Sequence, residues 1–170
     1  MEKRSEKLLL VVDSSILFSY FMLSKKIRRI IQKTPIILYT PDWAIHELNK
    51  YFYGKIAKKV LEKGVSKEEL EFIVLDLMER IIIVPKAIYQ DKFKDAFEIA
   101  KQFDLKDAPF IALALKLSIP IWTNDKKLIE FGIKTGRYLA LDTKAVEDLL
   151  NGKSLNEIID NLKDRYCSSR

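Results

Sequence analysis

The stretch Leu8-Leu9-Leu10-Val11-Val12-Asp13 joins an uninterrupted apolar run to an acidic residue. A short apolar run without alternation is typical of a strand that is covered on both faces, as in a parallel sheet. Asp13 then stands at the carboxyl end of that strand, which is where open α/β sheets bind their ligands. The segment therefore predicts an α/β fold and places its functional site at one edge of the sheet.

Further apolar runs repeat this pattern along the chain, and helix-like segments separate them. We expect strands at 36–39, 81–84, 119–122 and 138–141. We expect helices at 43–62, 67–80, 89–103, 108–117, 143–150 and 154–166, with capping boxes at Ser66 and Ser154. This alternation predicts a three-layer α/β sandwich, in which a central, mostly parallel sheet of about five strands is flanked by helices.

The length of 170 residues suits one domain with a substantial core. The composition, with 48% hydrophobic and 32% charged residues, is typical of a compact chain. We therefore predict a single domain over 1–170, with 142–170 as a carboxyl-terminal helical extension packed on it. No apolar run approaches the roughly 20 residues that cross a bilayer, so we expect a cytoplasmic protein without membrane contact.

The composition excludes several classes of protein. A lone cysteine, Cys167, and a lone histidine, His46, leave too few groups for a disulfide, a zinc site or a Ser-His-Asp triad. Scattered glycines form no phosphate-binding loop, which argues against a nucleotide cofactor. Pro85 follows the third strand where a receiver domain needs an aspartate, and Ser15 stands where a haloacid-dehalogenase-like phosphatase needs its second acid. The net charge of +6 favours nucleic acid as a partner.

Four acidic residues from separate segments are expected at the same sheet edge. Asp13 and Asp125 follow the first and fourth strands, Glu47 lies one turn into the helix after the second strand, and Asp107 begins the helix that precedes the fourth. Carboxylates held together repel one another unless a cation neutralises them. An all-oxygen ligand set favours Mg²⁺ or Mn²⁺, ions that promote phosphodiester hydrolysis.

Each acid also has an ordinary interpretation. Asp13 and Asp107 could cap helices, Glu47 could be a solvated helix residue, and Asp125 could belong to a turn. The coincidence of all four at one edge favours a functional site.

Neighbouring polar residues have less specific signals. Asp104 is either an auxiliary metal ligand or a helix-end turn residue. Lys126 and Lys127 are either RNA-binding phosphate contacts or a solvated turn. We expect a surface or packing role for His46, which points about 100° away from Glu47 on its helix.

Together these segments resemble the PIN-domain family, which includes the VapC-like toxin ribonucleases. The resemblance covers about residues 8 to 141. The matching pieces are Leu10-Val11-Val12-Asp13-Ser14-Ser15, Trp43-Ala44-Ile45-His46-Glu47-Leu48, Asp104-Leu105-Lys106-Asp107-Ala108-Pro109-Phe110-Ile111-Ala112-Leu113-Ala114-Leu115, and Ile121-Trp122-Thr123-Asn124-Asp125.

By this resemblance, Asp13, Glu47, Asp107 and Asp125 are the catalytic and metal-binding acids. Thr123 would support the site through its hydroxyl, and Ser14 and Asn124 are further supporting candidates. The implied activity is cleavage of single-stranded RNA by a homodimer. The long helical region between Trp43 and Arg80 and the added final helix depart from the minimal toxin pattern and leave a toxin role open.

A non-catalytic module that binds RNA or protein is the alternative interpretation, and metal-dependent cleavage separates the two. The amphipathic segments after Trp43 and Ser154 could form a dimer interface or bind an antitoxin. That hypothesis expects four apolar residues of the last helix in the interface, namely Leu155, Ile158, Ile159 and Leu162.

Overall fold

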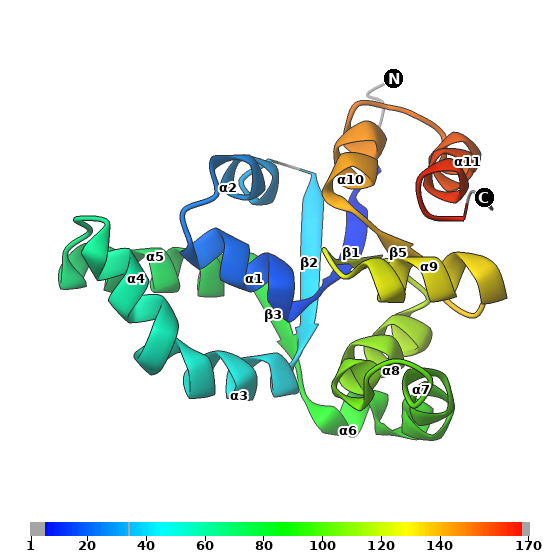
Figure 1. Ribbon diagram of the computed structural model, residues 1–170, viewed down its shortest axis with the longest axis horizontal. Coiled ribbons are helices and arrows are strands. Elements are labelled where there is room, and N and C mark those ends of the chain that lie inside the picture. The colour runs from blue at the N-terminus through cyan, green and yellow to red at the C-terminus, as the bar shows by residue number, and fades with distance from the viewer. Residues whose placement is uncertain (1–5, 34, 168–170) are drawn as a thin grey trace.

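The structure is a computed structural model that describes residues 6–33 and 35–167 (Figure 1). The ends of the expected domain, 1–5 and 168–170, lie outside the described residues. The elements follow in the order β1 (Leu8–Val12), α1 (Ser14–Phe21), α2 (Lys25–Ile31), β2 (Ile36–Pro41), α3 (Asp42–Tyr51), η1 (Phe52–Ile56), α4 (Ala57–Glu62), α5 (Lys67–Arg80), β3 (Ile81–Val84), α6 (Lys86–Tyr89), η2 (Gln90–Lys92), α7 (Phe93–Ala100), η3 (Leu105–Asp107), α8 (Ala108–Leu117), β4 (Ile121–Trp122), α9 (Lys126–Thr135), β5 (Ala140–Leu141), α10 (Thr143–Leu150) and α11 (Leu155–Tyr166).

The described strands form one sheet in the order β3-β2-β1-β4-β5, and every pairing in it is parallel. The chain builds outward from β1 to β2 and β3, then returns to the other side of β1 for β4 and β5. The strand order therefore reverses between β1 and β4, where Val12 pairs with Trp122. A crevice at such a reversal is the usual ligand site of an open α/β sheet.

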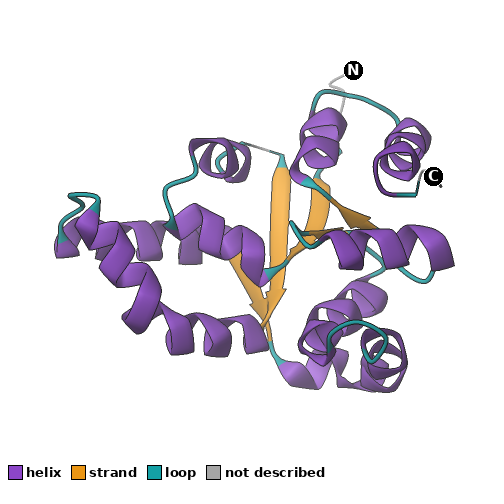
Figure 2. Ribbon diagram, viewed as in Figure 1, coloured by secondary structure: helices purple, strands orange, loops and turns teal. Residues whose placement is uncertain are grey.

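Helices cover both faces of the sheet, which confirms the predicted three-layer architecture. Figure 1 shows α1, α2 and α5 on one side of the strands and α7, α8 and α9 on the other. Helix α8 contacts β1, β2 and β4. This distribution is expected from right-handed crossovers, because the direction of chain movement across the sheet reverses after β3. Figure 2 separates the central strands from the surrounding helices by colour.

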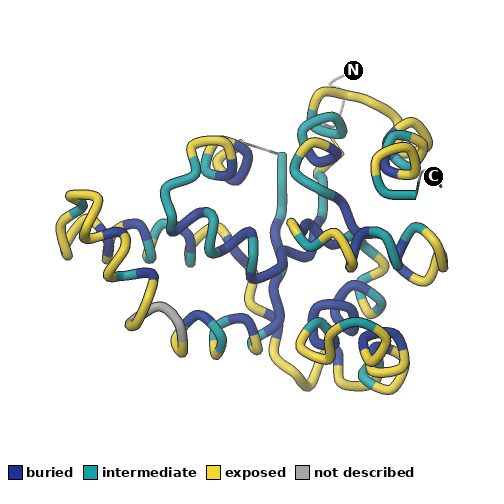
Figure 3. The backbone as a smooth tube through the Cα atoms, in the orientation of Figure 1, coloured by how far each residue is buried: buried dark blue, intermediate teal, exposed yellow. Residues whose placement is uncertain are grey.

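The core follows the middle of the sheet. Leu10, Val11 and Val12 are fully buried, as is Trp122 of the neighbouring strand, and Figure 3 shows α8 largely buried beside them. The apolar run 81–84 behaves differently from the run in β1. Because β3 is an edge strand, its central residues Ile82 and Ile83 are 48% and 36% exposed.

The best predicted helices are those with clear end signals. Helices α5, α8 and α10 have the predicted bounds, and the capping box at Ser66 is formed in full. The segment 43–62 is not one α-helix, because a π-helical turn containing Gly54, a poor helix former, divides α3 from α4. The segment 89–103 also differs: α6 begins earlier, directly after Pro85, and η2 separates it from α7.

Helices α1, α2 and α9 were expected only as unspecified helical connections. In α1 most residues are buried, so the helix lacks the polar face that would reveal its period. None of the helices in the described residues is long and apolar enough to cross a membrane.

The apolar face of α11 is directed into the protein. Ile158 and Leu162 are buried, so the expectation that these two residues lie in an interface is wrong. Leu155 is 47% exposed, and Ile159 is partly exposed. The helix contacts α9, and at its far end Arg165 and Tyr166 both bond to the Asp142 carboxylate at the start of α10. These contacts join α11 to α9 and α10 instead of leaving its apolar stripe free.

Gly132 allows α9 to approach the chain that leads into β5. A Cβ atom at Gly132 would lie 2.8 Å from a ring carbon and 2.9 Å from the carbonyl oxygen of Tyr138, whose hydroxyl is fixed by a bond to the Leu128 carbonyl. We predict that Gly132→Ala lowers the free energy of unfolding by about 1–3 kcal/mol, as overpacking does. Urea unfolding would measure this loss. Gly54→Ala is the matched control, since no atom lies within 4 Å of its added Cβ; equal midpoints for the two variants would contradict the prediction.

Candidate active site

The four predicted acids lie where the carboxyl ends of the strands meet the starts of helices. Asp13 directly follows β1 and precedes α1, and Asp125 lies between β4 and α9. Glu47 lies on α3, which continues from β2, and Asp107 ends η3 at the start of α8. The sheet order brings the first two acids to the reversal point between β1 and β4. The acids therefore come from four segments that share one edge.

The acids interact electrostatically. Burial raises the pKa of Asp107 to about 8, and the charges of Asp13, Asp125, Asp104 and Glu47 contribute to the increase. A carboxyl group with such a pKa retains its proton near neutral pH, which is how crowded acids reduce their repulsion when no cation is present. The structure thus brings Asp13, Asp125, Glu47 and Asp104 within electrostatic reach of Asp107.

Asp13 is the most deeply placed of these acids, with only 6% of its surface exposed. Burial raises its pKa, and hydrogen bonds from Thr123 and Ser15 partly oppose that increase. The Thr123 hydroxyl donates to Asp13 Oδ2 at 2.6 Å, and the Ser15 hydroxyl donates to the same oxygen at 3.0 Å. Both donors fix the orientation of the carboxylate.

Several buried oxygen atoms in this region make no hydrogen bond to any described residue. They are Glu47 Oε1, Asp107 Oδ2 and Ser14 Oγ. Burial is the main cause that raises the pKa of Glu47, and the charge of Asp13 adds to it, while Trp43, Ser14 and Lys106 lower it in part. Buried polar atoms in folded proteins almost always have a hydrogen-bond partner. A group of buried oxygens without partners therefore indicates that a ligand of these atoms is missing from the site.

The helix-cap interpretation accounts for only some of the acids. Asp13 and Asp107 occupy N-cap positions, yet neither side chain accepts a capping hydrogen bond. Asp125 does cap α9, because its Oδ1 accepts from the backbone N–H groups of Lys127 and Leu128. Asp104 likewise accepts from the Lys106 N–H. Helix capping therefore accounts for one oxygen each of Asp125 and Asp104. It does not account for the burial of the Asp13 and Asp107 carboxyl groups.

Two of the three predicted supporting residues, Thr123 and Asn124, belong to a hydrogen-bonded set around Asp13, whereas the Ser14 hydroxyl does not. Besides bonding Asp13, the Thr123 hydroxyl accepts from the backbone N–H of Asp125, so one side chain links two acids. Asn124 lies on the exposed side, where its N–H donates to the Ser15 hydroxyl. Ser15 was not predicted as a supporting residue, although its position two residues after Asp13, at the start of a helix, was a usable signal.

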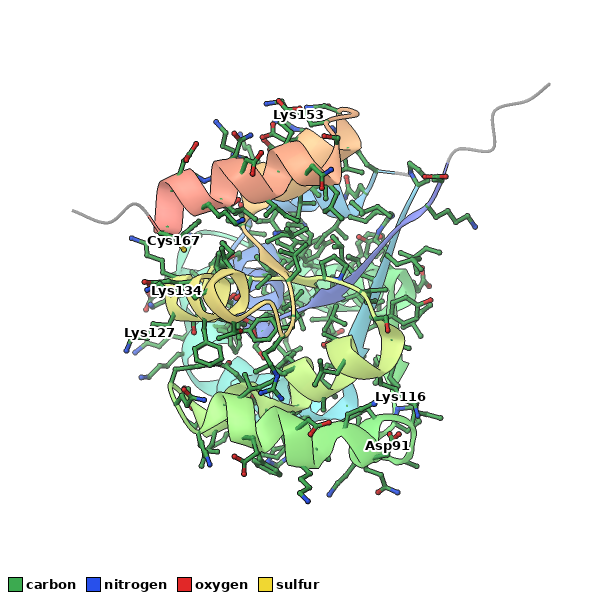
Figure 4. All side chains as sticks on the ribbon, turned by 90° about the vertical axis from the view of Figure 1, so that its right-hand side faces the viewer. Asp91, Lys116, Lys127, Lys134, Lys153 and Cys167 are labelled. Carbon is green, nitrogen blue, oxygen red and sulfur yellow. The ribbon has the colours of Figure 1, made fainter. Side chains whose placement is uncertain are left out.

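The remaining candidates lie nearer the surface. Lys126 and Lys127 are exposed at the start of α9, and Figure 4 shows Lys127 at the outer surface on the same side as Lys134. His46 is exposed, as expected, and its ring packs beside Trp43 with centroids 5.1 Å apart.

Comparison with protein families matches residues 11–161 to the PIN domain. The chain belongs to the PIN-domain family. A search of curated proteins found no significant match. PIN domains are in general nucleases that use divalent metal ions, so this PIN domain is a nuclease-type module. The roles of its individual acids stay predictions.

The donor set of this PIN domain fits a hard divalent cation. The three orphaned atoms of this site are oxygens, and two of them belong to carboxyl groups whose pKa burial raises. Carboxylate oxygens are the protein ligands that Mg²⁺ and Mn²⁺ prefer. Within 6–33 and 35–167, however, no three acidic, histidine or cysteine side chains already form an arrangement that could hold a metal ion.

The raised pKa of Asp107 predicts how stability varies with pH. Because its ordinary value is 3.8 and its value in the folded protein is about 8, the folded state holds a proton that the unfolded state has released over this interval. Its contribution to stability therefore falls as pH rises through the interval. We expect the thermal midpoint of the metal-free protein to fall between about pH 5 and about pH 8, and Asp107→Asn to flatten that fall.

Asp91 offers a matched control, because its exposed carboxylate pairs with Lys116, which lowers its pKa (Figure 4). Asp91→Asn should leave the slope over this pH interval unchanged, since the pKa of Asp91 lies below it in both states. An identical slope in wild type and Asp107→Asn would contradict the prediction.

Proposed function

We propose that this PIN domain is a metal-dependent endoribonuclease that hydrolyses phosphodiester bonds of single-stranded RNA with Mg²⁺ or Mn²⁺. The observation that supports it most directly is that Glu47 and Asp107 each have a buried carboxyl oxygen without a hydrogen-bond partner, within electrostatic reach of Asp13, which follows β1 at the strand-order reversal. A purely structural cluster would be satisfied by hydrogen bonds or cations of the chain itself. Asp107 Oδ2 has no hydrogen bond from the described residues. Trp43, Ser14 and Lys106 lower the pKa of Glu47 only in part, so the two carboxyl groups favour an external cation.

The proposed roles follow from how each acid is held. Asp13 has one oxygen engaged by Thr123 and Ser15, which orients the other. Asp125 has Oδ1 occupied by the start of α9, and the described residues make no hydrogen bond to its Oδ2. Each side chain is thus fixed by one oxygen and leaves the second available for a ligand.

Glu47 and Asp107 complete the proposed set, and each has a buried oxygen without a partner. The raised pKa of Asp107 means that its carboxyl group holds a proton until neighbouring negative charge is neutralised. When bound, a divalent ion supplies positive charge that neutralises a phosphodiester, and it lowers the pKa of water so that hydroxide is available to attack the phosphorus.

The net charge of +6 supports a polyanionic substrate. It does not distinguish RNA from DNA, so the choice of single-stranded RNA depends on the resemblance to PIN ribonucleases. We further propose that the protein acts as a homodimer.

The test is cleavage of a labelled single-stranded RNA with Mn²⁺, Mg²⁺ or EDTA. We expect cleavage only with a divalent ion. Asp13→Asn and Asp125→Asn should each reduce the rate by about 100-fold or more, the loss seen when a group that stabilises transition-state charge is removed. Thr123→Val should cost about 10- to 100-fold, because it removes a group that orients a ligand.

Asp160→Asn is the control, because Asp160 is an exposed residue of α11. Its rate should match that of the wild type. Intact RNA under every condition, with folding confirmed by circular dichroism, would instead support the alternative of a non-catalytic module that binds RNA or protein.

A toxin role with an antitoxin partner is a narrower form of this proposal. It predicts that expression of the chain alone arrests growth and that Asp13→Asn relieves the arrest, because cellular RNA is then spared. Culture density after induction measures both effects. Normal growth with an enzyme that is active in vitro would contradict the toxin role and favour RNA processing.

A further inference from the structure

A groove lies beside the acid cluster, between α3 on one wall and α6, α7 and the start of α8 on the other. Its volume of about 560 Å³ falls within the roughly 300–1,000 Å³ of ordinary ligand pockets. Aromatic and basic side chains dominate its lining, chiefly Trp43, His46, Phe93, Phe97, Lys86 and Lys106. The four acids are not among its lining residues, so the groove is a separate feature of this edge.

The aromatic rings form two facing walls. On α7, Phe93 and Phe97 are stacked with centroids 5.4 Å apart and planes 24° apart. On α3, the rings of Trp43 and His46 pack together. Trp43 is 39% exposed and Phe97 is 47% exposed. Flat rings that remain open to solvent inside a hollow indicate a ligand with an apolar face.

The walls are held in place by polar contacts at the base of the groove. The carboxylate of Asp42, the first residue of α3, accepts hydrogen bonds from the Tyr89 hydroxyl and the Lys86 backbone N–H of α6. The Tyr89 ring in turn packs against Phe93 at 5.5 Å. These contacts connect both walls, so little ordering is required when a ligand enters.

Two lysines, Lys86 and Lys106, contribute positive charge to the groove. The Lys86 ammonium lies 5.5 Å from the centre of the Phe93 ring. Lys106 also lines the groove, is exposed, and lies close enough to Glu47 to lower its pKa. In the part of the chain that the structure describes, neither lysine forms an ion pair. Rings flanked by unpaired cations suit a ligand that combines an aromatic base with phosphate.

Two segments of the chain contribute residues to both the groove and the acid cluster. Trp43 and Glu47 lie one helical turn apart on α3 and so share a face. Lys106 directly precedes Asp107. Trp43 and Lys106 are close enough to Glu47 to lower its pKa. The two segments that line the groove therefore also carry Glu47 and Asp107, so a strand bound in the groove lies beside these acids.

We propose that this groove binds an unpaired base of the nucleic acid substrate, which stacks on Trp43 and Phe97, while Lys86 and Lys106 contact the flanking phosphates. The proposal rests on the proposed nuclease function, whose substrate it specifies as a strand with at least one unstacked base. Stacking is tolerant of base identity, so the groove selects single strands over duplexes rather than a particular sequence.

Binding in EDTA tests the groove without any cleavage. The probes are a labelled oligouridylate of about six nucleotides and an abasic sugar–phosphate chain of the same length. We expect the wild type to bind the uridylate about 10-fold more tightly than the abasic chain. Trp43→Ala and Phe97→Ala should each reduce this ratio, whereas Lys106→Gln should weaken both probes alike, because it removes a phosphate contact.

Tryptophan fluorescence reports the same event directly. The chain has two tryptophans, and Trp122 is fully buried, so quenching by the uridylate would arise from Trp43. Phe72→Ala and Lys63→Gln are the matched controls, because both residues are exposed on the α4–α5 region away from the groove. Neither control should change the ratio or the quenching.

The outcomes separate the groove from the nuclease. Equal affinity for both probes with no quenching would overturn the groove proposal even if RNA is cleaved. Base-dependent binding that Trp43→Ala abolishes would support it even if no metal ion yields cleavage. A groove covered by a second copy would also overturn it: in that case Trp43→Ala and Phe97→Ala convert a dimer to a monomer in sedimentation and leave oligonucleotide binding unchanged.

Discussion

The hydrogen bond from the Thr123 hydroxyl to Asp13 connects the two strands between which the sheet reverses its order. It lies beside the backbone bond from the Asp13 N–H to the Trp122 carbonyl, so side chain and main chain fix the same junction. Thr123 also accepts from the Asp125 N–H, and Ser15 relays the connection to Asn124. The positions of α1 and α9, and of the acids at their starts, depend on this junction.

The junction is costly because it holds carboxyl groups away from water. Burial raises the pKa of Asp13, Glu47 and Asp107, and each acid adds to the repulsion felt by Asp107. Proteins tolerate such local destabilisation where function requires it and compensate elsewhere. Here the surrounding apolar core, from Val12 of β1 to Trp122 of β4, is fully buried and holds the strand ends in place. The result is an edge that is stable as a scaffold and electrostatically strained at its acids.

The two faces of this edge differ in chemistry. The acid cluster is rich in oxygen and demands positive charge, whereas the groove beside it is aromatic and carries Lys86 and Lys106. Helix α3 contributes to both, through Glu47 and Trp43 on one helical face. One amphipathic helix thus places a cluster of carboxyl groups next to a surface suited to a flat ligand that carries phosphate.

The sequence by itself determined the class of fold and predicted which acids gather at one edge of the sheet. Uninterrupted apolar runs such as 8–12 identify buried parallel strands because burial on both faces removes alternation, and an acid that follows such a run lies at the ligand-binding edge. It could not show that β3 is an edge strand with Ile82 and Ile83 exposed, or that α11 turns Ile158 and Leu162 inward. Those facts depend on which elements are neighbours, as do the bond from Thr123 to Asp13 and the groove between α3 and α7. Only the tertiary structure decides such pairings, because residues far apart in sequence become partners through the order of strands in the sheet.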